Sequence, residues 1–254
     1  MQALAQWWRR RSQDAVRHAW GLAPQAGCWV LVGLKRKHQG LAQVHSVHDL
    51  LPPVGMDALD PSWLSSHLLH KGRASGVNRN RLNLALPNTQ LQEGQIELPA
   101  ELPSDDWPHE VLWEVSQALQ LPPEAVHFDF EPDPLTDGRV QRLHWIACAR
   151  SDVLAFKSCT RAAGWRLATV ETEMQAAQRA VRVLQGGVDS LLTQAPQDWQ
   201  FRVSAPVSPD VKEDPYASVP ADAPEALSLG LGHILQSQGR ARLVASGLAL
   251  RAWQ

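Results

Sequence analysis

Cysteine is scarce in this 254-residue chain, and its three cysteines follow no metal-binding or redox spacing. Cys28, Cys148 and Cys159 are odd in number, and no two of them form a Cys-x-x-Cys pair. Two of the three lie in apolar runs, where a free cysteine behaves as a small hydrophobic residue. This usage favours a reducing compartment.

Long apolar runs and an excess of one charge are also absent. No segment approaches the roughly 18 to 20 continuous apolar residues of a membrane span, and the start of the chain lacks the apolar core of a secretion signal. Lys and Arg together number 24 and Asp and Glu 26, so the broad basic surface typical of nucleic-acid-binding proteins is not expected. We therefore expect a cytoplasmic protein without a nucleic-acid partner.

The N-terminal segment, residues 1–27, departs from this even charge. Trp7 and Trp8 stand directly before a run of three arginines. Aromatic side chains next to basic ones are typical of segments that lie on a membrane surface. The same pattern is typical of a solvated first helix whose tryptophans pack on the domain. Both interpretations stay open, and only the first implies peripheral membrane contact through residues 1–20.

Short alternating strands and helical stripes dominate the middle of the chain. Strands are predicted at 29–34, 82–86, 95–98, 126–130, 140–149 and 165–170, and helices between 104 and 122 and from 151 to 163. The order from 82 to 170 is therefore β-β-α-β-β-α-β, which predicts a compact α/β sandwich with its helices on one face. A further helix is predicted at 171–184 because an apolar stripe ends there at two glycines.

The ordered set of signals resembles the first half of PilM, the actin-like cytoplasmic protein of type IV pilus assembly, and its shorter HofM- and MshI-type relatives. The motifs that carry the resemblance are LALP at 84–87, IELP at 96–99, WEV at 113–115, the turn AAG at 162–164 and VETE at 170–173. The run GLALR at 247–251 is similar to the closing helix of that family. No single motif is decisive, so the resemblance rests on their order.

The resemblance implies an α/β fold that is a single-lobed, truncated actin-like (RNase H-like) remnant with an inserted β-β-α-β-β-α-β module. The second lobe is expected to be missing, because the chain passes from two glycines to a Pro-rich stretch and then to the GLALR run. After the N-terminal segment, the implied parts are a partial subdomain 1A at 28–81, a subdomain 1B-like module at 82–170, a helix and strand returning to 1A at 171–203, a Pro-rich linker at 204–224 and a C-terminal helical segment packing on 1A at 225–254.

Nucleotide binding is disfavoured at the hairpin that follows the strand 29–34. In the PilM family a phosphate-binding hairpin with an Asp-x-Gly pattern and several hydroxyl residues follows the opening strand, whereas this turn has neither an acid nor a hydroxyl. Lys35, Arg36 and Lys37 could still attract an anion. Without a second lobe, no walled cleft would stabilise phosphoryl transfer. We expect no cofactor; the alternative is a degenerate nucleotide-binding protein with weak ATPase activity that uses these three residues.

No other pattern predicts catalysis or a metal. His67 and His70 lie three residues apart on a short predicted helix, but a zinc site needs three or four ligands. Asp129 and Glu131, with Asp133 nearby, could form a carboxylate pair for acid–base chemistry. Their alternation with phenylalanines favours a solvent-facing strand surface instead. The common nucleophile and phosphate-loop motifs do not occur.

The function implied by the resemblance is a non-catalytic cytoplasmic adaptor at the inner face of the inner membrane. It would act in type IV pilus biogenesis, or in related secretion or DNA-uptake machinery. Its expected partner is the N-terminal cytoplasmic peptide of a PilN-like inner-membrane protein, bound in a groove near the strands at 82–98. Strand edges and grooves beside helices suit the capture of an extended peptide.

Overall fold

The structure is a computed structural model, and it describes residues 18–37, 40–69, 71, 80–133, 140–203 and 239–253. Several sequence predictions lie outside these residues. They concern residues 1–17 of the N-terminal segment, His70, the Pro-rich linker and the first part of the C-terminal segment.

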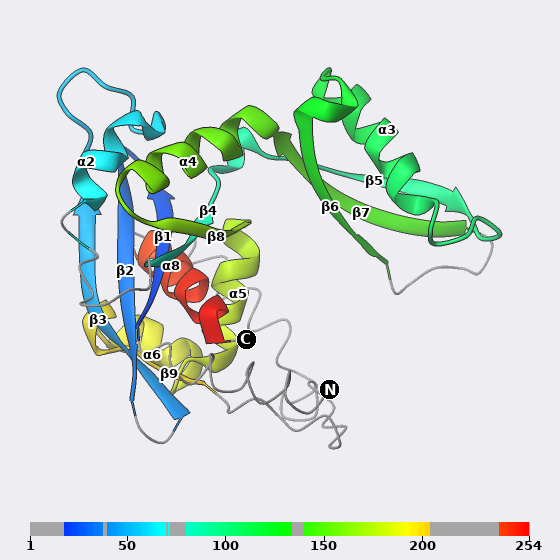
Figure 1. The fold of residues 1–254 in the computed structure, drawn as a ribbon. Helices are drawn as coiled ribbons and strands as arrows, with labels where there is room; N and C mark the ends of the chain where they lie inside the picture. Colours follow the sequence, from blue (N-terminus) through cyan, green and yellow to red (C-terminus); the bar gives the residue numbers. More distant parts are fainter. Residues whose placement is uncertain are drawn as a thin grey trace, which may run out of the picture.

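The larger of two sheets has six strands in the order β8-β4-β1-β2-β3-β9 (Figure 1). An antiparallel meander forms its middle, and two strands parallel to β1 extend it on one side. The short β9 pairs with the first residues of β3 on the other side. The strands are β1 (His18–Gln25), β2 (Cys28–Arg36), β3 (Leu41–Leu50), β4 (Arg81–Ala85), β8 (Arg166–Glu171) and β9 (Gln200–Arg202).

The smaller sheet has three antiparallel strands in the order β5-β7-β6 and extends away from the larger sheet (Figure 1). Its strands are β5 (Gln92–Pro99), β6 (Val126–Pro132) and β7 (Val140–Ala149). Helix α3 (Trp107–Leu119) covers one face and supplies Val111 and Val115 to a core of its own.

Helices cover both faces of the larger sheet. One face carries α5 (Glu173–Val183) and α8 (Arg240–Leu250), and the other carries α2 (Leu64–Leu68) and α4 (Arg150–Ala162). The remaining elements are α6 (Gly187–Thr193) and the 3₁₀ turns η2 (Pro61–Trp63), η3 (Asn88–Gln90), η4 (Pro123–Ala125), η5 (Pro196–Asp198) and η6 (Arg251–Trp253). Within the described residues, no helix is long and apolar enough to cross a membrane.

The structure corrects two sequence predictions. The expected order β-β-α-β-β-α-β does occur between Arg81 and Glu171, but these elements do not form one sandwich. β4 and β8 pair with each other in the larger sheet, so only the stretch from β5 to β7 forms the smaller one. Alternation marks a residue run as a strand, whereas its pairing partner is decided by contacts distant in sequence.

The second correction concerns β1, which lies inside the segment 1–27 that was expected to precede the fold. A glycine and a proline weaken its strand pattern. The glycine is required by packing: a Cβ on Gly21 would overlap the carbonyl oxygen of Ala245 in α8. The described part of the C-terminal segment therefore lies directly against the middle of the larger sheet.

Helix α8 is buried between the sheet and α5. From Leu243 to Leu250 every residue is buried, and the Asn83 side chain donates a hydrogen bond of 2.9 Å to the Leu248 carbonyl. Small residues allow this close approach, because a Cβ on Gly247 would overlap the carbonyl oxygen of Ala176 in α5. The C-terminal helix is thus part of the main core.

Tryptophans build the core on the opposite face. Trp29 is fully buried and its indole N–H donates to the Ala58 carbonyl at 2.7 Å. Trp165 donates to the Leu68 carbonyl at 3.0 Å. Cys148 and Cys159 also lie in this core, and burial raises the pKa of each thiol to about 11. Both therefore behave as small hydrophobic residues, as the sequence predicts.

Candidate functional site

The smaller sheet has one face that no described helix covers. Along β6, Val126, Phe128 and Phe130 join the core under α3, so the alternating residues His127, Asp129 and Glu131 point to the opposite face. Along β7 the same alternation leaves Arg142, His144 and Ile146 on this open face. Its residues on β5 are Glu93, Gln95 and Glu97.

Strand register orders the open face into rows. Ile146 pairs with Glu93 on one side and with Asp129 on the other. His144 pairs in the same way with Gln95 and Glu131. Ile146 is therefore an apolar residue between two carboxylates, and a second row of polar side chains lies next to it.

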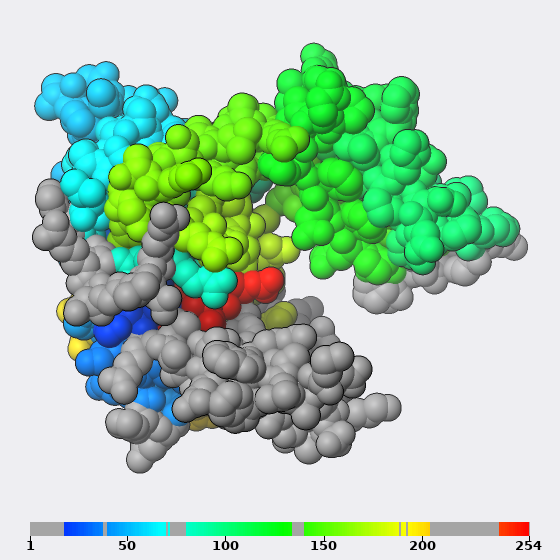
Figure 2. All heavy atoms as spheres, in the orientation of Figure 1, coloured from blue at the N-terminus to red at the C-terminus, as the bar shows by residue number. Residues whose placement is uncertain are grey.

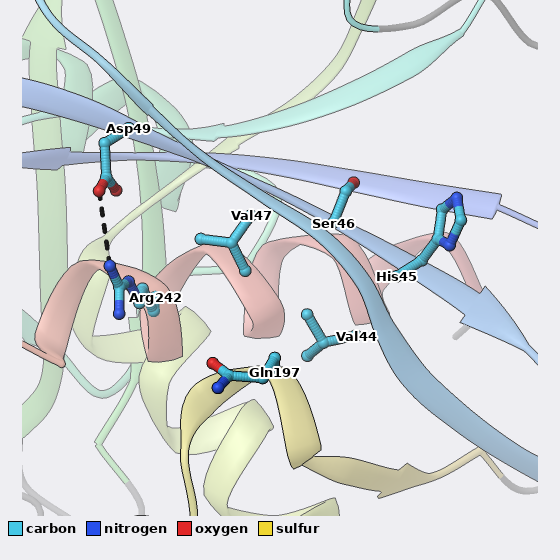
Figure 3. Close-up of a pocket in the computed structure, with 7 residues that line it drawn as sticks. All are labelled: Val44, His45, Ser46, Val47, Asp49, Gln197 and Arg242. Carbon is cyan, nitrogen blue, oxygen red and sulfur yellow. Dashed lines mark hydrogen bonds and ion pairs between the residues drawn. The ribbon is translucent and has the colours of Figure 1, made fainter.

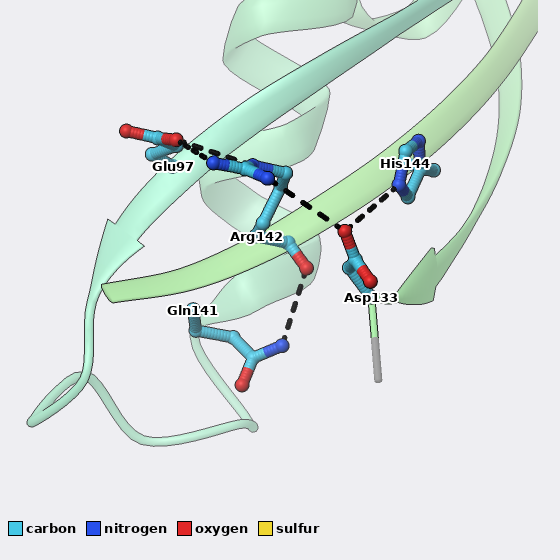
Figure 4. A network of polar contacts seen from close by, with 5 residues as sticks. All are labelled: Glu97, Asp133, Gln141, Arg142 and His144. Carbon is cyan, nitrogen blue, oxygen red and sulfur yellow. Dashed lines mark hydrogen bonds and ion pairs between the residues drawn. The ribbon is translucent and has the colours of Figure 1, made fainter. Parts of the chain in front are cut away.

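A polar network lies at the Arg142 end of the open face (Figure 4). Arg142 donates to Glu97 from Nε at 3.1 Å and from Nη2 at 2.6 Å. Its Nη1 lies 3.8 Å from Asp133, whose carboxylate also lies 3.4 Å from His144 Nε2. Arg142 and Glu97 are about half exposed, so the pair contributes ~1 kcal/mol or less to stability. The Arg142 guanidinium offsets the charge of Glu97 and part of the charge of Asp133.

The open face borders a hollow in the molecular surface. Cys148, which continues the open face of β7, packs into the tryptophan-rich core of the larger sheet. The smaller sheet is therefore anchored to the main body at this end. Figure 2 shows the surface hollowed between the three-stranded part (green) and the α5 and C-terminal elements (yellow-green and red). This is the region in which the sequence resemblance places a peptide groove.

Ion pairs of two buried glutamates join the main-body elements nearby. Glu171 at the end of β8 lies 2.7 Å from Arg179 of α5 and 3.2 Å from Arg251 after α8. Glu173, at the start of α5, lies 2.7 Å from Arg240 at the start of α8. These contacts join β8, α5 and α8. In the sequence both glutamates stand out only as part of the VETE motif, and no local pattern indicates their arginine partners.

Burial raises the pKa of Glu173, although the Arg240 guanidinium and the Asn88 backbone N–H act against this rise. A raised pKa means that the folded protein binds the proton more tightly than the unfolded chain. Protonated Glu173 therefore contributes to the free energy of unfolding. This contribution is fully present below the ordinary pKa of 4.5 and is lost as the pH rises through the raised pKa of the folded protein.

We expect this to appear in Glu173→Gln. The free energy of unfolding of the natural protein, relative to that of Glu173→Gln, should fall as the pH rises from about 4 to 8, because only the natural side chain ionises. Urea denaturation across this range measures the difference. Gln95→Ala, at an exposed side chain that does not ionise, is the control, and its free energy of unfolding should change with pH as that of the natural protein does. A difference for Glu173→Gln that does not change with pH would contradict the prediction.

The hairpin that carries Lys35, Arg36 and Lys37 is not the one that follows the first strand of the fold. Lys35, Arg36 and Lys37 lie at the end of β2, so their turn joins the second and third strands and does not follow the opening strand. The hairpin after the opening strand is formed by Gln25, Ala26, Gly27 and Cys28. These residues carry no carboxylate or hydroxyl, so this hairpin also lacks the side chains that would hold magnesium or phosphate.

The other candidate residues do not converge. Asp129 and Glu131 are exposed, and the Asp129 carboxylate accepts the Phe130 backbone N–H at 3.0 Å. His67 packs its ring on Trp63, with a centroid distance of 5.0 Å. Within the residues that the structure describes, no group of three or more metal-ligating side chains occurs.

A second groove, of 310 Å³, was not indicated by the sequence. It lies along β3 beside α8 and η5 (Figure 3). Arg242 of α8 closes one end through a 3.4 Å contact with Asp49. Its lining residues are Val44, His45, Ser46, Val47, Asp49, Gln197 and Arg242.

Comparisons with known proteins support the architecture described above. No protein-family model and no curated protein matches the chain. Among the 27 matching chains of solved structures is one from a "PilM-PilN type IV pilus biogenesis complex", with a TM-score of 0.52 and 20% sequence identity. The chain has a PilM-like fold. The match covers 65% of this chain and 50% of the solved chain, so the similarity spans half the length of the solved chain.

Proposed function

We propose that this protein is a non-catalytic cytoplasmic adaptor in type IV pilus biogenesis or in related secretion or DNA-uptake machinery. It binds the N-terminal cytoplasmic peptide of a PilN-like inner-membrane protein and is held by this partner at the inner face of the membrane. The observation that carries the proposal is the PilM-like fold, since the matching solved chain comes from a complex with PilN.

The open face of the smaller sheet supports this proposal. Three strands present a surface without a covering helix in the described residues, and this surface borders the hollow beside the main body (Figure 2). Ile146 offers an apolar contact on the central strand of this face. An extended peptide can bind such a groove through side-chain pockets and backbone contacts without any catalytic group.

A direct binding measurement tests the function. Fluorescence anisotropy with a labelled peptide from the N-terminus of the organism's own PilN-like protein should give a dissociation constant of about 1–100 µM, which is in the range of transient peptide complexes. A scrambled peptide is the first control. Failure of the natural peptide to bind more tightly than the scrambled one would overturn the proposal.

A substitution at Ile146 tests whether the peptide binds to the open face. Ile146→Lys should weaken peptide binding about tenfold or more, because it introduces a long charged side chain where an apolar contact is expected. Trp113→Ala is the matched control, since Trp113 is 62% exposed on α3, which covers the opposite face of the same sheet. This control should bind the peptide like the natural protein.

As such an adaptor, the protein uses no nucleotide. Neither the β1–β2 turn nor Lys35, Arg36 and Lys37 combine a carboxylate for magnesium with a hydroxyl for phosphate. Equilibrium dialysis with labelled ATP and magnesium should therefore give no retention of nucleotide. Micromolar binding would favour the alternative of a degenerate nucleotide-binding protein.

A further inference from the structure

The open face of the smaller sheet is unevenly charged. Five carboxylates lie on it or at its margin, namely Glu93, Glu97, Asp129, Glu131 and Asp133. Arg142 is the one arginine or lysine that the described strands place on this face, and it pairs with Glu97 and contacts Asp133 (Figure 4). Within the described residues, Glu93, Asp129 and Glu131 therefore keep negative charge without an ion pair.

The three remaining carboxylates surround an apolar centre. Directly paired residues on neighbouring strands have their Cβ atoms about 5 Å apart, so Glu93 and Asp129 lie about 10 Å from each other with Ile146 between them. Glu131 is two residues along β6 from Asp129, about 7 Å further on the same face. Among the described residues these carboxylates are not part of any group of three or more side chains that could hold a metal ion.

We propose that the segment that binds this face is basic, with an apolar side chain that packs on Ile146 and with Lys or Arg side chains that pair with Glu93 and with Asp129 or Glu131. The inference rests on the proposed function and adds the chemistry of the partner segment. Long cationic side chains suit this surface, because their methylene groups pack on apolar area while their charged ends reach the carboxylates. Phosphate-rich partners, such as nucleic acid or an anionic membrane surface, would be repelled.

The ion pair of Arg142 determines which carboxylates of the open face remain available to the basic partner segment. Glu97 is paired with Arg142 and Asp133 lies near the same guanidinium, so a cation close to these two carboxylates gains less than one close to Glu93 or Asp129. The partner segment should therefore lie across the end of the sheet nearer to Cys148, where the sheet joins the main body. That end is the one beside the hollow shown in Figure 2.

A charge-removal variant tests the inference. Glu93→Gln, Asp129→Asn and Glu131→Gln together should weaken binding of the PilN-like peptide about tenfold or more at low salt. The affinity of this triple variant should also depend less on salt concentration than that of the natural protein, because fewer charge contacts remain to be screened. The control triple variant Glu101→Gln, Asp105→Asn and Glu124→Gln removes the same charge from exposed positions off this face and should bind within about twofold of the natural protein.

A complementary change in the peptide completes the test. Replacement of its Lys and Arg residues by Gln should weaken binding to the natural protein, and the same replacement should have little further effect on the open-face triple variant. If this triple variant binds the unaltered peptide within about twofold of the natural protein, the charge inference is overturned and the proposed function stands. If no peptide binds the natural protein, both are overturned.

Discussion

Replacement of Gly247 by valine is expected to destabilise the protein by about 3 kcal/mol or more, because the contact between α8 and α5 has no space for a side chain. A Cβ at this position would overlap the Ala176 carbonyl oxygen and lie 2.5 Å from its carbon. Both atoms belong to the backbone of α5, so neither can rotate away. The Gly247 carbonyl also accepts a hydrogen bond of 3.0 Å from Arg179, which fixes the two helices further.

The smaller substitution Gly247→Ala should also destabilise the protein, which is the opposite of its usual effect in a helix. In an ordinary exposed helix, Gly→Ala stabilises by about 1 kcal/mol. At Gly247 the methyl group meets the backbone of α5, so we expect a loss of about 1–3 kcal/mol instead.

Urea denaturation measures these effects. The control is Arg242→Ala in the same helix, which removes only a partly exposed 3.4 Å ion pair and should change stability by ~1 kcal/mol or less. If Gly247→Ala stabilises the protein, the close packing of α8 on α5 is wrong.

Replacement of Trp29 by alanine should cost about 3–5 kcal/mol, because it empties the centre of the second core. Trp29 is fully buried, its ring packs on Phe156 at a centroid distance of 5.2 Å, and its indole N–H donates to the Ala58 carbonyl. Since single domains have free energies of unfolding of about 5–15 kcal/mol, such a loss is a large part of the total.

Two further tryptophan variants separate packing from hydrogen bonding. Trp29→Phe keeps most of the ring but leaves the Ala58 carbonyl without its donor, and should cost about 1–3 kcal/mol. Trp113→Ala removes a residue of the same type that is 62% exposed, and should change stability by about 0.5 kcal/mol or less. Thermal unfolding followed by circular dichroism measures all three. Equal losses for Trp29→Ala and Trp113→Ala would contradict the buried position of Trp29.

Part of the candidate site could be predicted from the sequence. The alternation of phenylalanines with acids along 126–131 placed Asp129 and Glu131 on one solvent-facing side, and the structure shows them exposed. The same rule applied to 92–99 would have placed Glu93 and Glu97 on one side of β5. No local pattern could show that Ile146 lies between Glu93 and Asp129, because that row depends on the register of three strands.

The N-terminal boundary shows where sequence patterns fail. β1 was not predicted, because Gly21 and Pro24 are unfavourable in strands when only local preference is considered. In the folded chain, Gly21 is needed where α8 crosses the sheet, more than 200 residues later in the sequence. Because β1 was not predicted, the hairpin after the opening strand was expected between β2 and β3. In the structure the opening strand is β1, so that hairpin lies between β1 and β2.

The sequence by itself determined which segments from residue 81 to 171 are strands and helices, because that information is contained in the periodicity of neighbouring residues. Only the tertiary structure decided that β4 and β8 join the meander while β5, β6 and β7 form a separate sheet. It also decided that, within the described residues, one face of this separate sheet has no covering helix and carries three carboxylates without an ion pair. The pairing of strands, their register and the helices that cover a sheet face depend on contacts between residues far apart in the chain. No local sequence pattern specifies these contacts.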